Sequence, residues 1–245
     1  ATGVYKSRNI NLNKFNAPNV VPALEFLIAS NKKGLKDKVI DFENGRLNSK
    51  DKDVLVIGGG DTAMDCVRTA VRQGAKSIKC LYRRNKQNMP GSQREVENAI
   101  EEGVDFMWQT LPIEYLGSHK IQQTKIINTI LGSPDDSGRS STEPVIGSEQ
   151  NLNSDLIIEA LGFEPENLPK IFNKDELQVT QWGTLKINFK TMMTNLKGVF
   201  AAGDIVRGAS LVVWGIKDGR DAANNIHEYL NSKEEAYYKK TNTKY

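Results

Sequence analysis

Cysteine is scarce in this sequence. The 245 residues include two, Cys66 and Cys80, which do not form a Cys-x-x-Cys pair. Two isolated cysteines exclude a dense disulfide framework and supply no zinc or iron–sulfur ligand set. We therefore expect no metal site and a reduced, cytoplasmic protein. Cys66 falls within a predicted helix and is expected to be a small core residue, not a redox thiol.

Long hydrophobic runs and an excess of one charge are missing too, and histidine is scarce. The longest apolar runs, such as Val54–Ile57 and Leu211–Trp214, are far too short to cross a bilayer, so no membrane partner is expected. The net charge is only +3 and the two signs are interspersed, which argues against a nucleic-acid partner. His119 and His227 are expected at surface or packing positions and not as catalytic bases.

The first half of the chain alternates between two kinds of hydrophobic pattern. Val54–Ile57 is a short continuous apolar run of the kind found in buried parallel strands. Ser92 followed by Glu95 three residues later forms the pattern of a helix capping box. We expect strands at 54–57, 77–82 and 104–108, and helices at 20–30, 61–72 and 92–102. This alternation predicts a parallel α/β sheet.

The second half has a different character. Alternating residues at 120–131 predict a strand in an antiparallel meander, and the Ser-, Pro- and Gly-rich segment 133–147 predicts a loop. Segment 155–160 is again a buried strand pattern. We further expect hairpin-like alternation at 178–187, a strand at 199–202 that ends at Gly203, and an amphipathic helix at 218–230.

The glycine-rich segment after the first buried strand carries the strongest motif. Gly58-x-Gly60-x-x-Ala63 follows a strand and opens a helix, the context that distinguishes a dinucleotide fingerprint from a chance match. The first glycine permits a tight turn, the second lets a pyrophosphate approach the backbone, and the small third residue lets the helix pack on the strand. Backbone N–H groups and the helix dipole then hold the phosphates.

The end of the second strand predicts which dinucleotide binds. NAD enzymes place an acidic residue about 20 residues after the fingerprint to bind the ribose hydroxyls. Here Tyr82 is followed by Arg83 and Arg84, and no acidic residue occupies 80–88. Two guanidinium groups suit a 2′-phosphate through charge-assisted hydrogen bonds. We therefore expect NADP(H); a solvated basic turn is the alternative.

Longer motifs carry a resemblance to a known family. They are GGGDTAMDCVR at 58–68, YRR at 82–84, NMPGS at 88–92, EEGV at 101–104 and FAAGDIVRGASLVVW at 200–214. They closely resemble the small (beta) subunit of NADPH-dependent glutamate synthase over nearly the whole chain, least distinctively at 114–150. Thioredoxin-reductase-like, dihydropyrimidine dehydrogenase and ferredoxin:NADP transhydrogenase flavoproteins share parts of these motifs.

The resemblance implies an NADPH-dependent oxidoreductase, the electron-input flavoprotein of glutamate synthase. Hydride would pass from NADPH to FAD, and electrons would leave through iron–sulfur clusters to the large subunit, which makes glutamate from glutamine and 2-oxoglutarate. The implied fold is α/β and Rossmann-like, with one complete NADP domain plus the C-terminal part of an FAD domain. The domains would be 1–12 (end of the N-terminal FAD part), 13–165 (NADP domain) and 166–245 (C-terminal FAD part).

The resemblance also assigns cofactor-binding residues. Asp204, after the Gly203 turn, would bond the ribityl chain of FAD, and Ser210 and Leu211 would open the segment near the flavin ring. Thr2 and Gly3 match a strand end of the FAD domain. No catalytic residue is assigned, because hydride transfer to flavin needs positioning more than acid–base groups. The NADPH ligands would be Gly58, Gly59, Gly60, Asp61, Thr62, Ala63, Arg83 and Arg84.

The start of the sequence departs from the family. The family's cysteine-rich segment and first glycine fingerprint would precede Ala1, which is not an initiator Met. Three explanations are open: a second polypeptide supplies the missing N-terminal half, the chain is a fragment of a longer protein, or it is a decayed remnant. Whether this chain alone binds FAD is also open. Half a Rossmann sheet should expose apolar faces. Two further readings are a non-catalytic NADP-binding remnant and a ferredoxin- or sulfide-linked NADP oxidoreductase subunit.

Overall fold

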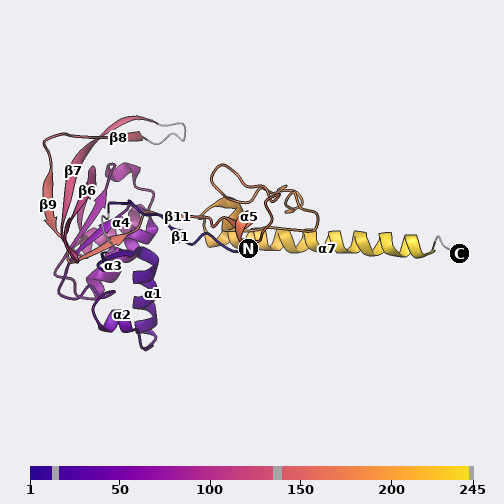
Figure 1. The fold of residues 1–245 in the computed structure, drawn as a ribbon, viewed down its shortest axis with the longest axis horizontal. Helices are drawn as coiled ribbons and strands as arrows, with labels where there is room; N and C mark the ends of the chain where they lie inside the picture. Colours follow the sequence, from indigo (N-terminus) through magenta and orange to yellow (C-terminus); the bar gives the residue numbers. More distant parts are fainter. Residues whose placement is uncertain (13–16, 135–139, 243–245) are drawn as a thin grey trace. The chain divides into compact units, whose positions relative to one another are not determined.

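The computed structural model describes residues 1–12, 17–134 and 140–242, with side chains described up to residue 234 (Figure 1). The chain divides into two compact units. The larger unit is Ser7–Gly162, and the smaller unit combines Ala1–Lys6 with Phe163–Tyr245. The short strands β1 (Lys6–Ser7) and β11 (Phe163–Glu164) pair with each other where the chain passes between the units.

A five-stranded parallel sheet forms the centre of the larger unit, in the order β2-β10-β3-β4-β5. Its inner strand β10 pairs Ile157 with Val20 on one side and with Leu55 on the other. Because every strand of a parallel sheet ends at the same edge, the segments that follow these strands lie together. The strands are β2 (Val20–Pro22), β3 (Asp53–Ile57), β4 (Ser77–Tyr82), β5 (Asp105–Trp108) and β10 (Leu156–Glu159).

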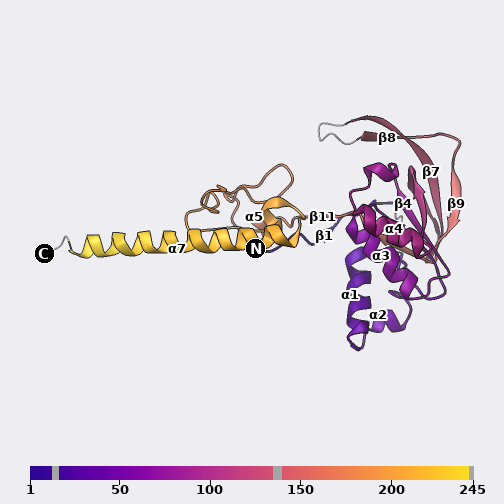
Figure 2. The same cartoon turned by 180° about the vertical axis from the view of Figure 1, so that it is seen from behind.

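Helices cover one face of this sheet (Figures 1 and 2). The core on this face joins Val54 and Val56 of β3 to Phe26, Met64 and Val96 on three of the helices. Burial of such side chains supplies about 1.5–3 kcal/mol each. The helices are α1 (Ala23–Gly34), α2 (Ile40–Glu43), α3 (Asp61–Arg72), the 3-10 turn η1 (Lys86–Asn88) and α4 (Gln93–Glu101). The parallel α/β sheet, its strands 54–57 and 77–82 and the helix 61–72 are thus confirmed.

An antiparallel meander covers the other face. Its strands pack Tyr115, Ile121 and Ile126 against Leu55 and Ile57, the β3 residues that alternate with those facing the helices. Strand β7 is the centre of the meander and pairs with the other three strands. They are β6 (Thr110–Gly117), β7 (Ile121–Pro134), β8 (Ser140–Pro144) and β9 (Gln150–Asn153).

Two sequence predictions in the larger unit are wrong in part. The expected loop at 133–147 contains β8, whose polar, half-exposed residues pair with β7 and so lack hydrophobic alternation; residues 135–139 lie outside the described part. The helix expected from Val20 begins at Ala23, because Val20 and Val21 pair with β10 and Pro22 takes the N-cap position. Tertiary pairing therefore overrides the local helical spacing.

The smaller unit is built from helices and irregular segments around Leu168, Leu177, Leu185 and Ile205. An antiparallel bridge between Val179 and Leu185 confirms the hairpin-like segment. The strand expected at 199–202 is wrong: in the described structure this segment forms a single bridge, from Phe200 to Met193, and no continuous ladder. The helices are α5 (Leu168–Ile171), α6 (Asp204–Arg207) and α7 (Val212–Asn242), the last longer than the predicted 218–230.

Candidate functional site

A cavity of about 650 Å³ lies at the carboxyl edge of the parallel sheet, wholly within the larger unit. Its walls come from the segments that follow β3, β4 and β10, where open α/β sheets bind ligands. Residues 8–10 and 110–112 complete the wall. Of the residues predicted to hold a dinucleotide, those that line it are Gly58, Gly59, Gly60, Thr62, Arg83 and Arg84.

The three glycines of the turn are required for different reasons. Gly58 has a φ of +147°, and a Cβ there would stand 2.2 Å from the carbonyl oxygen of Ala160. A Cβ on Gly59 would stand 2.4 Å from the ring of Tyr82. Gly60 has an ordinary φ of −91°, and a Cβ there would meet nothing within 4 Å. The fold requires the first two glycines, whereas the third leaves open space beside the cavity.

The first turn of α3 begins at this open space. Gly60 is its N-cap and has no side chain that could accept the first N–H groups of the helix. Thr62 lies in this turn and lines the cavity. Ala63 is fully buried between α3 and the sheet, so it packs the helix on the strand and does not line the cavity. An exposed helix N-terminus with these features is suited to bind an anion.

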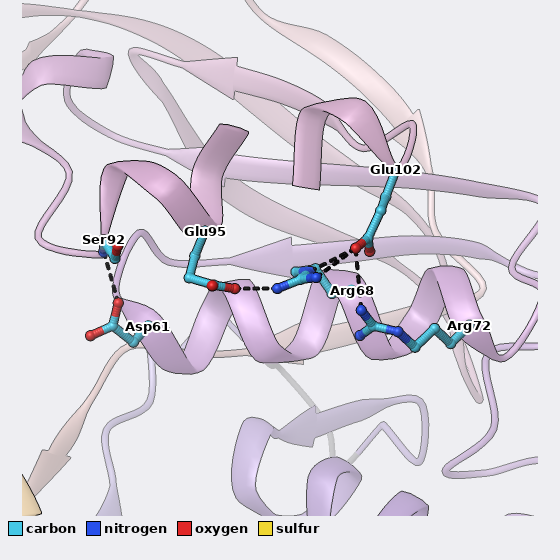
Figure 3. Close-up of polar contacts among 6 residues, drawn as sticks. All are labelled: Asp61, Arg68, Arg72, Ser92, Glu95 and Glu102. Carbon is cyan, nitrogen blue, oxygen red and sulfur yellow. Dashed lines mark hydrogen bonds and ion pairs between the residues drawn. The ribbon is translucent and has the colours of Figure 1, made fainter. Parts of the chain in front are cut away.

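The segment Met89–Ser92 holds the glycine turn from outside. The Gly91 N–H donates to the Gly59 carbonyl at 3.0 Å, and the Ser92 N–H donates to Asp61 Oδ1 at 2.8 Å (Figure 3). Asp61 therefore takes the acceptor role expected of Glu95 in a capping box, and the capping-box prediction is wrong. Asp61 does not line the cavity. Sequence reasoning missed this contact because its partners are 31 residues apart.

Charged residues join α3 to α4 behind this contact. Figure 3 shows Arg68 between Glu95 and Glu102, with hydrogen bonds to both, and Arg72 reaching Glu102 at 3.2 Å. Glu95 is thus engaged by Arg68, which explains why it does not cap its own helix. The hydrogen bond from Arg68 also lowers the pKa of Glu102. The network joins the same two helices that the hydrogen bond between Asp61 and the N-cap residue Ser92 joins at their N-terminal ends.

The two arginines after β4 have different environments. Arg83 is exposed, whereas Arg84 is 8% exposed. The Arg84 Nε donates to the Ser140 carbonyl of β8 at 2.7 Å. Within the described part of the chain, neither guanidinium forms an ion pair with a carboxylate. Both arginines line this end of the cavity, and guanidinium groups suit a phosphate because they form charge-assisted hydrogen bonds with it.

A second group of predicted residues meets in the smaller unit. Gly203 has a φ of +76°, and the following Asp204 accepts a hydrogen bond from Ser210 Oγ at 2.8 Å. Leu211 is next to this contact and is 66% exposed. Thr2 and Gly3 belong to the same unit, but no hydrogen bond among the described residues joins them to this turn.

Asp218 of α7 supports that turn and was missed by sequence reasoning. Its side chain is almost fully buried, accepts both Arg207 Nε at 2.6 Å and Arg207 Nη2 at 2.7 Å, and accepts the Gly203 N–H at 3.3 Å. The Arg207 guanidinium lies 5.0 Å from the ring centroid of Trp214. The hydrogen bonds from Arg207 lower the pKa of Asp218. In the sequence, Asp218 looks like any polar residue of an amphipathic helix, so nothing local indicates that its carboxylate is buried.

Large apolar side chains are exposed on the smaller unit. The start of α7 is the densest region, with Val212 78% and Val213 64% exposed. Patches of this kind mark surfaces that another protein segment or a ligand covers. The other large apolar side chains exposed on this unit include Trp182, Phe189, Leu211, Trp214 and Ile216.

Residues 1–219 match the pyridine nucleotide-disulphide oxidoreductase family. The chain belongs to this family. It is 56% identical over 236 residues to the glutamate synthase [NADPH] small chain of Azospirillum brasilense, covering 96% of this chain and 49% of that protein. It is 43% identical over 237 residues to the Escherichia coli small chain, covering 93% and 49%. The resemblance to glutamate synthase small subunits is thus confirmed, and the chain spans about half the length of these curated relatives.

Two solved structures support the fold. Mycobacterium tuberculosis FprA in complex with NADPH matches with a TM-score of 0.75 at 17% identity, covering 97% of this chain and 64% of that chain. Thioredoxin reductase from T. acidophilum matches with a TM-score of 0.68 at 16% identity, covering 94% and 64%. These matches confirm the α/β, Rossmann-like FAD/NAD(P)-binding fold class.

The cysteine and histidine side chains of this chain lie outside the cavity lining. Cys66 and Cys80 are buried, and burial raises the pKa of the Cys80 thiol to about 12. His119 and His227 are exposed, as expected. No group of three or more His, Cys, Asp or Glu residues within the described ranges could hold a metal ion. Over the same ranges, no helix is long and apolar enough to span a membrane.

Proposed function

We propose that the larger unit binds NADPH and that the chain is the electron-input part of an FAD-dependent oxidoreductase of the glutamate synthase small-subunit type. One observation carries the proposal. A single cavity joins a glycine turn at a helix N-terminus to two arginines that lack carboxylate partners in the described structure. The names of the relatives, glutamate synthase [NADPH] small chain, fit this arrangement.

The proposed NADPH site assigns a role to each end of the cavity. The pyrophosphate would lie against Gly60 and Thr62, where open space and the first turn of α3 receive an anion. The 2′-phosphate would bind Arg83 and Arg84 through charge-assisted hydrogen bonds. Asp61 would position the glycine turn through its hydrogen bond from Ser92, and Ala63 would do so by packing α3 on the sheet. NADPH supplies a hydride when bound, and this chain's residues orient the dinucleotide.

The smaller unit is the proposed C-terminal part of an FAD domain. Gly203 and Asp204 would bond the flavin's ribityl chain, with Ser210 and Leu211 near the ring and Thr2 and Gly3 at a neighbouring strand end. The exposed apolar residues at the start of α7 support a requirement for a covering polypeptide. That partner would be the remaining half of the relatives' length, and electrons would pass on to a glutamate synthase large subunit in the cytoplasm.

The experiment measures flavin binding and electron transfer. The 245-residue chain is mixed with FAD, with and without the half of the A. brasilense small chain that this chain does not cover. We expect flavin absorbance to co-elute and a dye to be reduced by NADPH, much less by NADH, when both polypeptides are present. A colourless mixture without NADPH-dependent reduction would contradict the flavoenzyme. NADPH binding alone would then indicate a non-catalytic NADP-binding protein.

A further inference from the structure

The Arg83–Arg84 turn lies beyond the hydrogen-bond ladder of its own sheet. The last register pair between β4 and β5 joins Tyr82 to Trp108. Parallel pairing therefore ends one residue before Arg83. Something else must hold the backbone of the turn, because the direction of each guanidinium depends on the backbone that carries it.

The meander and the residue that precedes its first strand supply the missing bonds. Thr129 of β7 donates its hydroxyl to the Arg83 carbonyl at 2.7 Å. The Gln109 N–H donates to the Arg84 carbonyl at 2.9 Å. Two successive carbonyls of the turn are thus held from outside the parallel sheet, and Ser140 of β8 receives the Arg84 Nε as a third contact.

Thr129 and Gln109 also hold each other. The Thr129 N–H donates to the Gln109 carbonyl at 2.7 Å, and Gln109 Nε2 donates to the Thr129 carbonyl at 3.1 Å. Gln109 has a φ of +51°, an uncommon conformation for a residue with a side chain. Such conformations persist where the surroundings determine them and cluster at binding sites. Thr129 is 3% exposed, so water has little access to replace its hydroxyl.

We propose that Thr129 is a positioning residue that determines cofactor specificity: its hydroxyl holds the Arg83–Arg84 turn so that the arginines can bind a 2′-phosphate. The inference rests on the proposed NADPH site. NADPH and NADH differ only in the phosphate that the arginines would bind. Loss of a contact that acts through this turn should therefore weaken NADPH binding and leave NADH binding unchanged, whereas general damage to the fold should weaken both.

The test compares substitutions on one strand. Thr129→Val replaces the hydroxyl with a methyl group and keeps the shape. Thr129→Ala removes both the hydroxyl and the methyl group of threonine, and Thr129→Ser retains the hydroxyl. Thr124→Val is the matched control, since Thr124 is a fully buried β7 residue whose hydroxyl contacts Ser154 Oγ at 2.9 Å, away from the turn. Dissociation constants for NADPH and NADH are measured by calorimetry on the 245-residue chain, with thermal melting alongside.

We expect T129V and T129A to raise the Kd for NADPH about three- to tenfold, the range of one hydrogen bond, with NADH within twofold. T129S should retain most of the preference, and T124V should leave the NADPH-to-NADH ratio unchanged. An unchanged ratio in T129V or T129A, in a wild-type chain that does prefer NADPH, would overturn the role of Thr129. A wild-type chain without that preference would instead refute the proposed NADPH site.

Discussion

The glycines in the turn after β3 are subject to different structural constraints. Gly58 is required by backbone conformation and by the carbonyl of Ala160, which a side chain would meet. Gly60 faces open space and adopts a conformation that any residue can take. Because the fold does not require a glycine at position 60, the open space points to the approach of a ligand.

This difference predicts opposite results for two alanine substitutions. Gly58→Ala should destabilise the protein by about 1–3 kcal/mol from backbone strain alone, with a further cost from the contact with Ala160. Gly60→Ala should destabilise the protein less, by up to about 1 kcal/mol for an alanine N-cap. It should weaken NADPH binding about tenfold or more, because a methyl group would occupy the space for the pyrophosphate. Thermal melting and calorimetric titration of both variants measure the two effects. A Gly60→Ala variant that bound NADPH normally would argue against this role.

The arginine pair predicts a selective loss of affinity. Arg83→Ala and Arg84→Ala should each weaken NADPH binding by about 1.5–3 kcal/mol, the range of a charged hydrogen bond, with little effect on NADH. Arg94→Ala is a suitable control, since Arg94 is an exposed arginine that does not line the cavity. Fluorescence titration with both nucleotides gives the comparison. Equal losses for NADPH and NADH would contradict a 2′-phosphate contact.

At the scale of elements, the carboxylate of α3 that caps α4 should contribute to stability. Asp61→Ala removes the acceptor of the Ser92 N–H and should cost about 0.5–2 kcal/mol, the range of an N-cap. Asp61→Asn keeps an oxygen acceptor and should cost much less. Urea unfolding of both variants measures the difference. If the two variants are equally stable, the hydrogen bond from Ser92 is not what Asp61 contributes.

The contact between α6 and α7 predicts an acid-sensitive step. Arg207 lowers the pKa of Asp218 below the ordinary value of 3.8. A carboxyl with a lowered folded-state pKa stabilises the folded state above that ordinary value and loses its contribution as pH falls through the lowered one. Asp218→Asn should therefore flatten the acid end of the stability–pH curve of the smaller unit. Identical acid limbs for the variant and the wild type would contradict this.

The sequence predicted elements where local pattern and tertiary role agree. The buried run at 54–57, the glycine turn and the helix at 61–72 are correct because one short segment contains the whole signal. Strand β8 was missed because its polar residues gain their structure from β7. Thr129 was missed for the same reason: it contacts Arg83 across 46 residues. The two arginines could be proposed as phosphate ligands from the sequence, whereas the residues that hold their backbone could not.

At the scale of the whole molecule, the two units differ in what their residues form. The cavity is formed by residues of the larger unit alone. The smaller unit exposes apolar side chains at the start of α7. This contrast predicts that nucleotide binding by the chain does not depend on FAD, whereas association with other polypeptides depends on the smaller unit.

Replacing two of the exposed valines should separate these properties. The double substitution Val212→Ser and Val213→Ser should reduce binding of a hydrophobic dye and self-association, because it replaces exposed apolar side chains with polar ones. NADPH affinity should stay within twofold of wild type. Light scattering, dye fluorescence and titration provide the three readouts. Reduced NADPH affinity in a folded variant would show that the cavity is not independent of this surface.

The central claim is that this chain holds a complete NADP site. Calorimetric titration of the wild-type chain with NADPH and with NADH tests it most directly. Two charged contacts to the 2′-phosphate predict that NADPH binds at least about tenfold more tightly, and that added salt reduces this advantage. Equal affinity for the two nucleotides, or binding of neither, would contradict the claim.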